Sequence, residues 1–470
     1  MSSVVARPFD RLPGRLIAAL DARGVPVVED PAILAGHAVD WTGHWCGPVL
    51  GMVRPRSTEQ VAGVLSAARS FGIPVQVQGG NTGLVGGSVP DRPSLLLSTL
   101  ALDRMHPVDR VERTVAVGAG VTAARLSGHA MAAGLRFGVD LAARDSATIG
   151  GMVATNAGGL AVCAHGMMRD QVRGVVAVLA DGRIVRTVGR PRKDNTGYDL
   201  TGLLVGSEGT LGVVTEIEVA LHQAPAAPTV ALLARSDLAG AVVAARTVQA
   251  SGWPVLAAEV VDAAGVSQVA RALGVPDPMA GRGRARWLLL LEVADAGTAE
   301  GLTPVADDVL AVATAAPDRA RLWAYRERQT EVYARLEGLR KLDIAVRLDR
   351  LDEAVAAIRG AVGSRQRVGF FGHALDGNLH VQVMLEDPPA GCRRGVGQAP
   401  GQAPDADRTV ERILEAVVSL GGSISAEHGI GRLKAPHLQL ARSAGEISWM
   451  RAIRASVDPE GLLNPGVLLS

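Results

Sequence analysis

Two short segments in the second half of the chain carry side chains that could bind a metal ion and move a proton. The first, residues 367–385, reads RVGFFGHALDGNLHVQVML, with apolar alternation on both sides of a short Asp-Gly-Asn turn. This pattern predicts a β-hairpin. Pairing of its two strands would bring the rings of His373 and His380 close together beside the turn. Two imidazoles converging beside carboxylates suit zinc or manganese, and polar packing of the two histidines is the alternative.

The second segment, residues 423–434, reads SISAEHGIGRLK. Its alternation predicts a strand that ends at Glu427 and His428. Adjacent residues of an extended segment face opposite ways, so one member of the pair could bind a metal while the other faces a substrate. A buried Glu-His pair without partners would be costly, which favours a functional site.

Three glycine-rich clusters in the first half of the chain could hold a large, flat cofactor. Residues 78–90 read QGGNTGLVGGSVP directly after a strand pattern, without the Gly-Lys-Ser/Thr ending of a Walker loop. Clustered glycines let successive backbone N–H groups point into one concavity, which suits a pyrophosphate, although one such cluster alone is more often a simple turn. Residues 145–159 (DSATIGGMVATNAGG) and 197–213 (GYDLTGLLVGSEGTLGV) share this character. Together the clusters indicate one extended cofactor lying along a groove.

A nicotinamide-binding Rossmann unit is the competing interpretation of the glycines. Residues 113–126 combine a strand, a Gly-Ala-Gly turn and a helix, and Asp140 follows about twenty residues later, which satisfies a loose fingerprint. The next strand pattern, LRFGVD, is short and weakly apolar, and no series of βαβ units continues the sheet. The flavin interpretation is therefore favoured.

The elements that must position these residues fall into two groups. In residues 1–224, mixed strand and helix patterns indicate an α+β domain. The expected segments are a helix at 11–24, a strand–helix–strand unit at 49–78 with Ser57 or Thr58 as the helix cap, strands at 95–100 and 113–118, a helix at 122–133, and a hairpin at 171–188 with an Asp181-Gly182 turn.

Pro225 and Pro228 mark the expected boundary of a second domain, residues 225–420, with an antiparallel sheet backed by helices. Residues 421–470 are expected to form a helical segment that closes the active site. The expected strands are VALLAR, WLLLLEV and LDIAVRL, the expected helices are 237–251, 302–314 and 351–361, and the Pro/Gly/Gln-rich residues 387–407 are expected to form a mobile surface loop.

Charge and composition exclude several classes of protein. The 48 Lys and Arg residues are balanced by 47 Asp and Glu residues, so no basic excess exists for nucleic-acid binding. Three scattered cysteines are too few for a zinc knuckle or an iron–sulfur cluster. The N-terminal residues show no signal-peptide pattern, and no run of about 18 apolar residues predicts a transmembrane segment. We therefore expect a cytoplasmic protein. The alternative is a protein that associates peripherally with the inner face of the membrane.

The three glycine-rich clusters resemble the FAD-binding domain of the vanillyl-alcohol-oxidase superfamily (the PCMH type). Within that superfamily, RKDNTGYDL followed by GSEGTLGVVTE resembles the D-lactate, glycolate and D-2-hydroxyglutarate dehydrogenases. The resemblance extends from about Val53 to Leu468. It implies an α+β fold with a PCMH-type FAD-binding domain, an antiparallel-sheet substrate (cap) domain with helices, and a C-terminal segment that returns to the FAD domain.

The resemblance also implies which residues form the site. Members with covalent flavin carry a His in the first glycine loop, where this chain has Asn81-Thr82, so FAD is expected to be non-covalent. The FAD-binding residues would be Gly79, Gly80, Asn81, Thr82, Gly83, Leu84, Ser146, Thr148, Gly150, Gly151, Asn156, Gly158, Gly159, Glu208, Val213 and Asn464. A divalent metal, zinc or alternatively manganese, would be held by His373, His380 and Glu427. His428 would be the catalytic base, and the substrate would contact Arg326, Thr330, Lys341 and Asn378.

The implied reaction is oxidation of a small D-2-hydroxy acid, D-2-hydroxyglutarate or D-lactate, to the 2-oxo acid by metal-assisted hydride transfer to flavin N5. A separate acceptor (electron-transfer flavoprotein, quinone or cytochrome) would reoxidise the flavin, and a homodimer is expected. The chain has Leu375 where relatives usually have Gly, Gln382 where hydroxyglutarate-type members have Asn, and AVRL at 345–348 where they tend to carry a Pro-terminated strand. The alternatives are an oxygen-using oxidase of another hydroxy or sugar acid without a metal, and a metal-independent mechanism in which His373 and His380 only donate hydrogen bonds.

Overall fold

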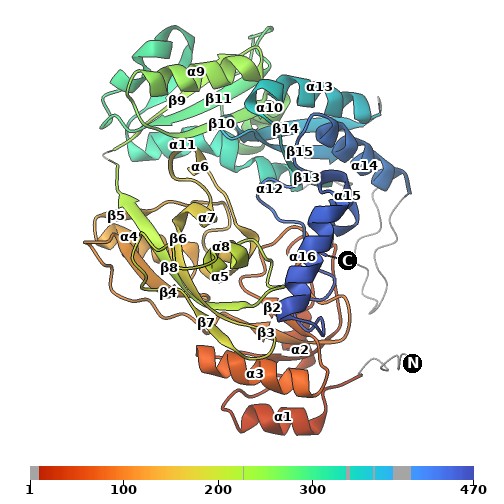
Figure 1. The fold of residues 1–470 in the computed structure, drawn as a ribbon. Helices are drawn as coiled ribbons and strands as arrows, with labels where there is room; N and C mark the ends of the chain where they lie inside the picture. The colour runs from red at the N-terminus through yellow and green to blue at the C-terminus, as the bar shows by residue number, and fades with distance from the viewer. Residues whose placement is uncertain (1–9, 226, 335–338, 364–365, 385–403, 470) are drawn as a thin grey trace.

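The computed structural model describes residues 10–225, 227–334, 339–363, 366–384 and 404–469. These residues form three β-sheets, two of which lie in the lower half of Figure 1 and one in the upper half. The expectation of a mobile loop at 387–407 falls mostly on residues outside this set; from Pro404 onward the chain is helical.

The first sheet is parallel and is built from the strand–helix–strand unit that the sequence predicts. Its strand order is β1-β3-β2. The α3 helix begins where Ser57 accepts a hydrogen bond from the backbone N–H of Gln60, so Ser57 is the cap. The elements are α1 (Gly14–Asp21), α2 (Pro31–His37), β1 (Val49–Val53), α3 (Thr58–Ser70), β2 (Val75–Gln78) and β3 (Ser94–Ser98).

The second sheet is antiparallel, with the order β4-β8-β6-β7 and with β5 paired to β8. The expected hairpin is confirmed, since β6 pairs with β7 and Gly182 in its turn has a φ of 88°, which glycine adopts without strain. The elements are β4 (Thr114–Gly118), α4 (Ala123–Ala132), β5 (Leu135–Phe137), α5 (Ile149–Thr155), α6 (Val162–His165), α7 (Met168–Gln171), β6 (Val172–Val178), β7 (Ile184–Arg186), α8 (Leu200–Leu204) and β8 (Val213–Gln223).

The third sheet has seven antiparallel strands in the order β12-β9-β11-β10-β14-β15-β13. Helices α9, α13 and α14 share one hydrophobic core with this sheet, and α10 and α11 share a second core with it. The elements are β9 (Thr229–Arg235), α9 (Leu238–Ala250), β10 (Val255–Asp262), α10 (Ala263–Leu273), β11 (Trp287–Val293), β12 (Val309–Ala313), α11 (Ala316–Glu327), α12 (Gln329–Ala334), β13 (Leu339–Ala345), α13 (Leu351–Ala361), β14 (Arg367–His373), β15 (Asn378–Met384) and α14 (Pro404–Ser419).

The helix expected at 302–314 is wrong. Residues Glu300–Asp308 form a 3₁₀-helix that contains Pro304, and its regular geometry is broken at Val305. Residues Val309–Ala313 then form β12, which pairs with β9 at the edge of the seven-stranded sheet. Proline removes a backbone donor, and the free sheet edge offers the following residues a ladder of partners.

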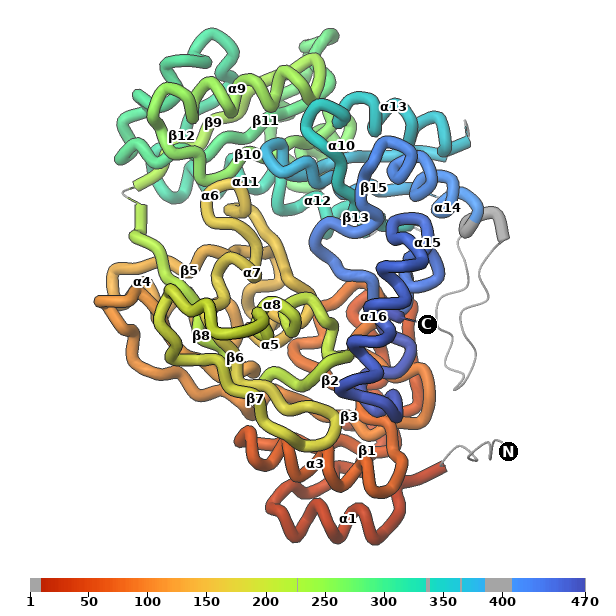
Figure 2. The backbone as a smooth tube through the Cα atoms, in the orientation of Figure 1, coloured from red at the N-terminus to blue at the C-terminus, as the bar shows by residue number. Residues whose placement is uncertain are grey.

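The C-terminal residues return to the first sheet, as the fold class predicts. Leu463 forms a bridge to Val75 of β2, and the backbone N–H of Asn464 donates to the Val75 carbonyl. The tube in Figure 2 follows α16 (Ala444–Val457) from the seven-stranded sheet down to the lower half, after the short helix α15 (Leu438–Ala441). Within the described residues, no helix is both long and apolar enough to cross a lipid bilayer.

Candidate active site

Strands β10, β13, β14 and β15 place four polar side chains, those of Glu259, Asp343, His373 and His380, on one face of the seven-stranded sheet. Glu259 lies opposite His373, and Asp343 lies opposite His380. Because side chains alternate along a strand, the residues next to these four point into the hydrophobic core on the other face. These core residues are Ala258, Val260, Leu342, Ile344, Leu379 and Val381.

The predicted hairpin is present, and it brings the two histidine rings together. Strands β14 and β15 pair across a turn in which Gly377 has a φ of 83°. The ring centroids of His373 and His380 are 5.8 Å apart. The Nδ1 atom of His373 lies 2.6 Å from Glu259 Oε1, whereas its Nε2 atom is buried without a hydrogen-bond partner and lies 3.9 Å from Glu427 Oε2.

Residues 424–431 do not form the expected strand; only Ser423 bridges Ala345. Instead, the backbone N–H groups of Ala426, Glu427 and His428 all donate to Asp343 Oδ2, at 3.0, 2.9 and 2.9 Å. The expectation that Glu427 and His428 face opposite ways is therefore wrong. The backbone curves around the Asp343 carboxylate as a loop, and both side chains lie on the same side, near His380.

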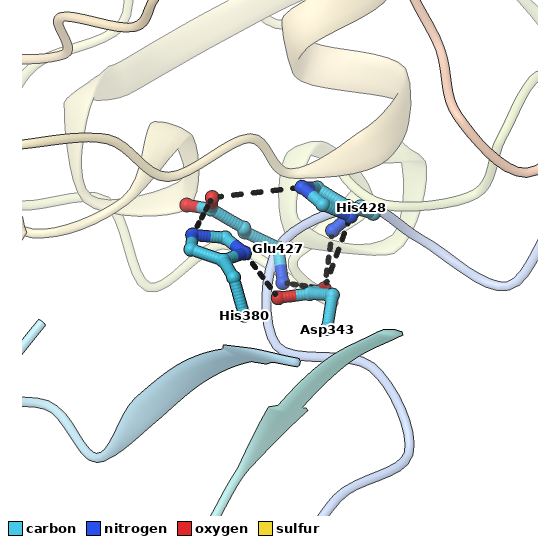
Figure 3. Close-up of side chains that lie close together, drawn as sticks. All are labelled: Asp343, His380, Glu427 and His428. Atoms are coloured by element: carbon cyan, nitrogen blue, oxygen red, sulfur yellow. Dashed lines mark hydrogen bonds and ion pairs between the residues drawn. The ribbon is translucent and has the colours of Figure 1, made fainter. Parts of the chain in front are cut away.

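Four side chains gather there closely enough to hold a metal ion (Figure 3). The candidate ligand atoms of Asp343, His380, Glu427 and His428 lie within 4.8 Å of one another. His380 Nε2 is 3.4 Å from Glu427 Oε1, and His428 Nε2 is 3.8 Å from the same oxygen. The second ring nitrogens face Asp343, at 3.7 Å from His380 Nδ1 and 3.8 Å from His428 Nδ1.

Burial and mutual charge shift the pKa values of this group. Burial lowers the pKa of His380 well below its usual value, and the charge of His428 adds to the effect. Burial also raises the pKa of Glu427. For Asp343 burial acts to raise the pKa, but the charges of His428 and Lys434 outweigh it and hold the pKa far below its usual range. A carboxylate that stays ionised among imidazoles suits a cation site.

His373 has the opposite shift. Burial by itself lowers its pKa, but the ion pair with Glu259 outweighs burial and raises the pKa to about 9. The same Glu259 carboxylate also accepts a hydrogen bond from Arg326 Nε at 2.7 Å. His373 is therefore held by its Nδ1 side, and its Nε2 side faces Glu427.

One cavity of about 610 Å³ joins this cluster to the glycine-rich segments. Nearly all the predicted FAD-binding residues line it: Gly79, Gly80, Asn81, Thr82, Gly83, Leu84, Ser146, Thr148, Gly150, Gly151, Gly158, Gly159, Glu208, Val213 and Asn464. The predicted metal, base and substrate residues His373, His380, Glu427, His428, Arg326, Thr330 and Lys341 line it too.

Two of the predicted site residues do not line the cavity. The Asn156 side chain accepts from the backbone N–H of Arg169 and caps α5 in a left-handed conformation. The Asn378 amide donates to Asp343 Oδ1 and to the Ile344 carbonyl. Both asparagine side chains therefore form hydrogen bonds with neighbouring protein groups, and the bond from Asn378 helps to fix the Asp343 carboxylate.

The first glycine loop fits a phosphate-bearing cofactor. Within the described residues, no backbone N–H between positions 80 and 84 donates to another protein group, and these residues line the cavity. A Cβ atom on Gly80 would collide with the Ser146 carbonyl, so glycine lets the first and second clusters touch. A Cβ atom on Gly158 would lie 2.7 Å from Glu427 Oε2, so the second cluster directly borders Glu427, one of the four gathered side chains.

Two cations line the cavity on the side of the seven-stranded sheet. Arg326 is buried, lies 4.6 Å from the centroid of the Phe371 ring, and donates through Nε to Glu259. Among the described residues its two terminal nitrogens have no hydrogen-bond acceptor. Lys341 Nζ lies 5.2 Å from the centroid of the Trp41 ring, and burial lowers the pKa of Lys341.

Sequence reasoning missed Glu259, Asp343 and Trp41. Glu259 and Asp343 each stand between apolar neighbours inside a strand, in VLAAEVVD and LRKLDIA, and an acidic residue flanked in this way is the signal that the sequence offers. Trp41 lies in an irregular segment far from the site in sequence, so no local signal pointed to it.

Comparison with known proteins shows the family to which the chain belongs. Residues 49–188 match the family described as FAD binding domain, and residues 224–468 match the family described as FAD linked oxidases, C-terminal domain. The chain is 35% identical to the mitochondrial D-2-hydroxyglutarate dehydrogenase of Bos taurus, over 98% of this chain and 86% of that protein. It is 34% identical to the D-2-hydroxyglutarate dehydrogenase of Xanthomonas citri pv. viticola, over 93% of each chain.

Solved structures with the same fold include p-cresol methylhydroxylase with substrate bound (TM-score 0.73, 16% identity, 98% of each chain). Alkyldihydroxyacetonephosphate synthase is similar to the same degree (TM-score 0.73, 16% identity, 98% of this chain and 87% of that one). At this identity the likeness concerns the fold, and it confirms the PCMH-type architecture. From the family matches and the near full-length relatives, the chain is an FAD-dependent oxidoreductase and belongs to the FAD-linked D-2-hydroxy acid dehydrogenase group of the vanillyl-alcohol-oxidase superfamily.

Proposed function

We propose that this protein oxidises a small D-2-hydroxy acid to the corresponding 2-oxo acid, with non-covalent FAD and a divalent metal ion. The observation that carries the proposal is the close approach of Gly158 to Glu427, because it joins a candidate metal ligand to the cavity that the predicted FAD-binding residues line. The names of the relatives support a hydroxy acid, and the absence of a His from residues 79–84 supports non-covalent flavin.

We assign the ion to His373, His380 and Glu427. Asp343 is a poorer ligand because its carboxylate already accepts four hydrogen bonds, from Asn378 and from the backbone of residues 426–428. Among the described residues, the buried Nε2 of His373 has no hydrogen-bond partner and faces Glu427. A bound metal ion would supply this nitrogen with a partner. Zinc is the first candidate and manganese the second, since two imidazoles and one carboxylate suit both.

When bound, the metal would supply a Lewis acid and FAD a two-electron acceptor. His428 would take the hydroxyl proton at Nε2, because its Nδ1 faces the ionised Asp343, which stabilises the imidazolium that forms. The free terminal nitrogens of Arg326 would bind a carboxylate as a fork, which fixes the substrate above the metal-binding group.

D-2-hydroxyglutarate is the favoured substrate, and D-lactate is the second candidate. The cavity offers two cations, Arg326 and Lys341, and a dicarboxylate would engage both. Losing one partner of a buried ion pair often costs about 2–5 kcal/mol. Lys341→Ala should therefore raise KM for D-2-hydroxyglutarate far more than for D-lactate, and equal losses for both acids would contradict a role for Lys341 at the second carboxylate.

The direct test is anaerobic bleaching of the bound flavin by D-2-hydroxyglutarate, D-lactate and glycolate, with the L-forms of the first two acids as controls. We expect stereoselective bleaching that EDTA abolishes and that zinc or manganese restores. Bleaching that survives EDTA would refute the metal, and rapid reoxidation by oxygen alone would favour the oxidase alternative. The acceptor (electron-transfer flavoprotein, quinone or cytochrome), a homodimer and a cytoplasmic location stay predictions.

A further inference from the structure

Glu259 is a buried carboxylate that lies next to the active site without lining its cavity. It sits in the middle of β10, its side chain is 1% exposed, and its sequence neighbours are apolar. A carboxylate in such surroundings is costly unless strong partners compensate it. Its partners therefore indicate why an acid occupies this position.

Each oxygen of Glu259 binds a different functional residue. Oε1 lies 2.6 Å from His373 Nδ1, and Oε2 lies 2.7 Å from Arg326 Nε. Both partners are buried and both line the cavity. One carboxylate thus connects a residue of the proposed metal site with a residue of the proposed carboxylate site.

The two contacts fix the direction of each partner. In the neutral ring that a metal ion requires, a hydrogen bond from Nδ1–H to Glu259 places the lone pair of His373 on Nε2, the atom that faces Glu427. The bond from Nε holds the guanidinium of Arg326 over the Phe371 ring and leaves its terminal nitrogens for another acceptor. Without an acceptor at this point, both side chains would gain rotational freedom.

We propose that Glu259 is a positioning residue that couples metal affinity to substrate-carboxylate affinity. The proposal rests on the function proposed above and adds that both binding events depend on one buried side chain that touches neither ligand. Because Glu259 contacts no ligand itself, its replacement should weaken two separately measured affinities at once.

The test is Glu259→Gln, whose single amide oxygen can accept from only one of the two donors. Zinc is titrated into metal-free, FAD-loaded protein by calorimetry, and the product dicarboxylate 2-oxoglutarate is titrated through the change it makes in the flavin spectrum. We expect the zinc Kd to rise about 10- to 100-fold, as for other partners of metal-binding histidines. We expect the Kd for 2-oxoglutarate to rise in the same variant.

Glu292→Gln is the matched control. Glu292 lies on the adjacent strand β11, bonds Trp323 on the helix that carries Arg326, and does not line the cavity. It should leave both affinities unchanged at equal FAD content. If Glu259→Gln fails to fold, Glu259→Asp carries the test, because it keeps both acceptor oxygens on a shorter stem and should weaken both affinities.

The outcomes separate the two proposals. A wild-type chain that binds neither zinc nor manganese would overturn the metal site itself. A wild-type chain that binds zinc, with a Glu259 variant whose zinc Kd is unchanged, would overturn the coupling alone. Loss of zinc affinity with intact 2-oxoglutarate affinity would also overturn it, since Glu259 would then serve only His373.

Discussion

Replacing Asp343 with Asn is expected to displace the loop of residues 424–431 while the rest of the fold stays intact. Asp343 is fully buried and accepts three backbone N–H bonds from that loop and one from Asn378. An Asn at this position has one acceptor oxygen, and its amide hydrogens would face donors that they cannot bind. The buried ammonium of Lys434, 3.8 Å from Oδ2, would lose its nearest counter-charge.

The size of the effect follows from these contacts. A hydrogen bond to a charged group contributes about 1.5–3 kcal/mol, and breaking a buried ion pair costs about 3–5 kcal/mol. Because the bonds share one carboxylate they are not additive, so we expect a loss of about 3–5 kcal/mol. A shift of about 1 Å in Glu427 and His428 would lower kcat/KM by on the order of 100-fold.

The assay compares thermal unfolding and anaerobic flavin reduction in Asp343→Asn and in Asp262→Asn. Asp262 is also buried in this sheet and accepts backbone bonds from Gly265 and Phe370, but it does not line the cavity. Both variants should be less stable, and only Asp343→Asn should lose activity while folded. Equal activity in the two folded variants would refute the reasoning.

The pH dependence gives an independent check on Asp343. Its pKa is depressed in the folded protein, so its contribution to stability is fully present above the unfolded value of about 3.9 and is lost only in strong acid. The stability difference between wild type and Asp343→Asn should therefore be the same at pH 5 and pH 8. A difference that vanishes at pH 5 would contradict an ionised Asp343.

Three further predictions follow from side chains around the cavity. His428→Asn should lower the rate of flavin reduction in stopped-flow experiments by about 10²–10⁴-fold with unchanged FAD and metal content, because it removes the proposed base. Trp41→Leu should raise KM about 2- to 5-fold with little change in kcat, since the exposed ring that faces Lys341 contributes about 0.5–1 kcal/mol. Burial and the charge of His222 lower the pKa of His165 to about 4, so the folded state resists its protonation. Stability should be full above about pH 6.5 and fall towards pH 4, and His165→Asn should flatten this dependence of the melting temperature.

The sequence predicted those parts of the site that depend on local signals. Alternation around an Asp-Gly turn was enough for the hairpin that carries His373 and His380, because register in a tight hairpin follows from the turn. The glycine clusters indicate one cofactor groove, because a backbone that approaches another group closely has no room for a Cβ atom. Gly80 and Gly158 are two positions where a Cβ atom would collide with a neighbouring group.

The parts that sequence reasoning missed depend on contacts between distant residues. The 424–431 loop has strand-like alternation, but its donors bind Asp343, more than eighty residues earlier in the chain, and no local pattern carries that information. The pattern of residues 302–314 predicts a helix where the edge strand β12 forms, because the partner strand β9 is equally remote in sequence. The Asn378 amide donates to Asp343 as well, and Asn378 does not line the cavity, so the substrate contact expected of it stays a prediction.

The 424–431 loop is held from both sides. Asp343 of the seven-stranded sheet binds residues 426–428, and Glu208 of the lower half binds the N–H groups of Ile430 and Gly431 at 2.8 Å. Neither carboxylate can bind the loop until its own half has folded, and most of both halves precedes the loop in the chain. We therefore expect catalytic competence to appear after the secondary structure of the two halves has formed. The recovery of activity should lag behind the recovery of secondary structure in a refolding experiment, so turnover reports when the two halves have joined.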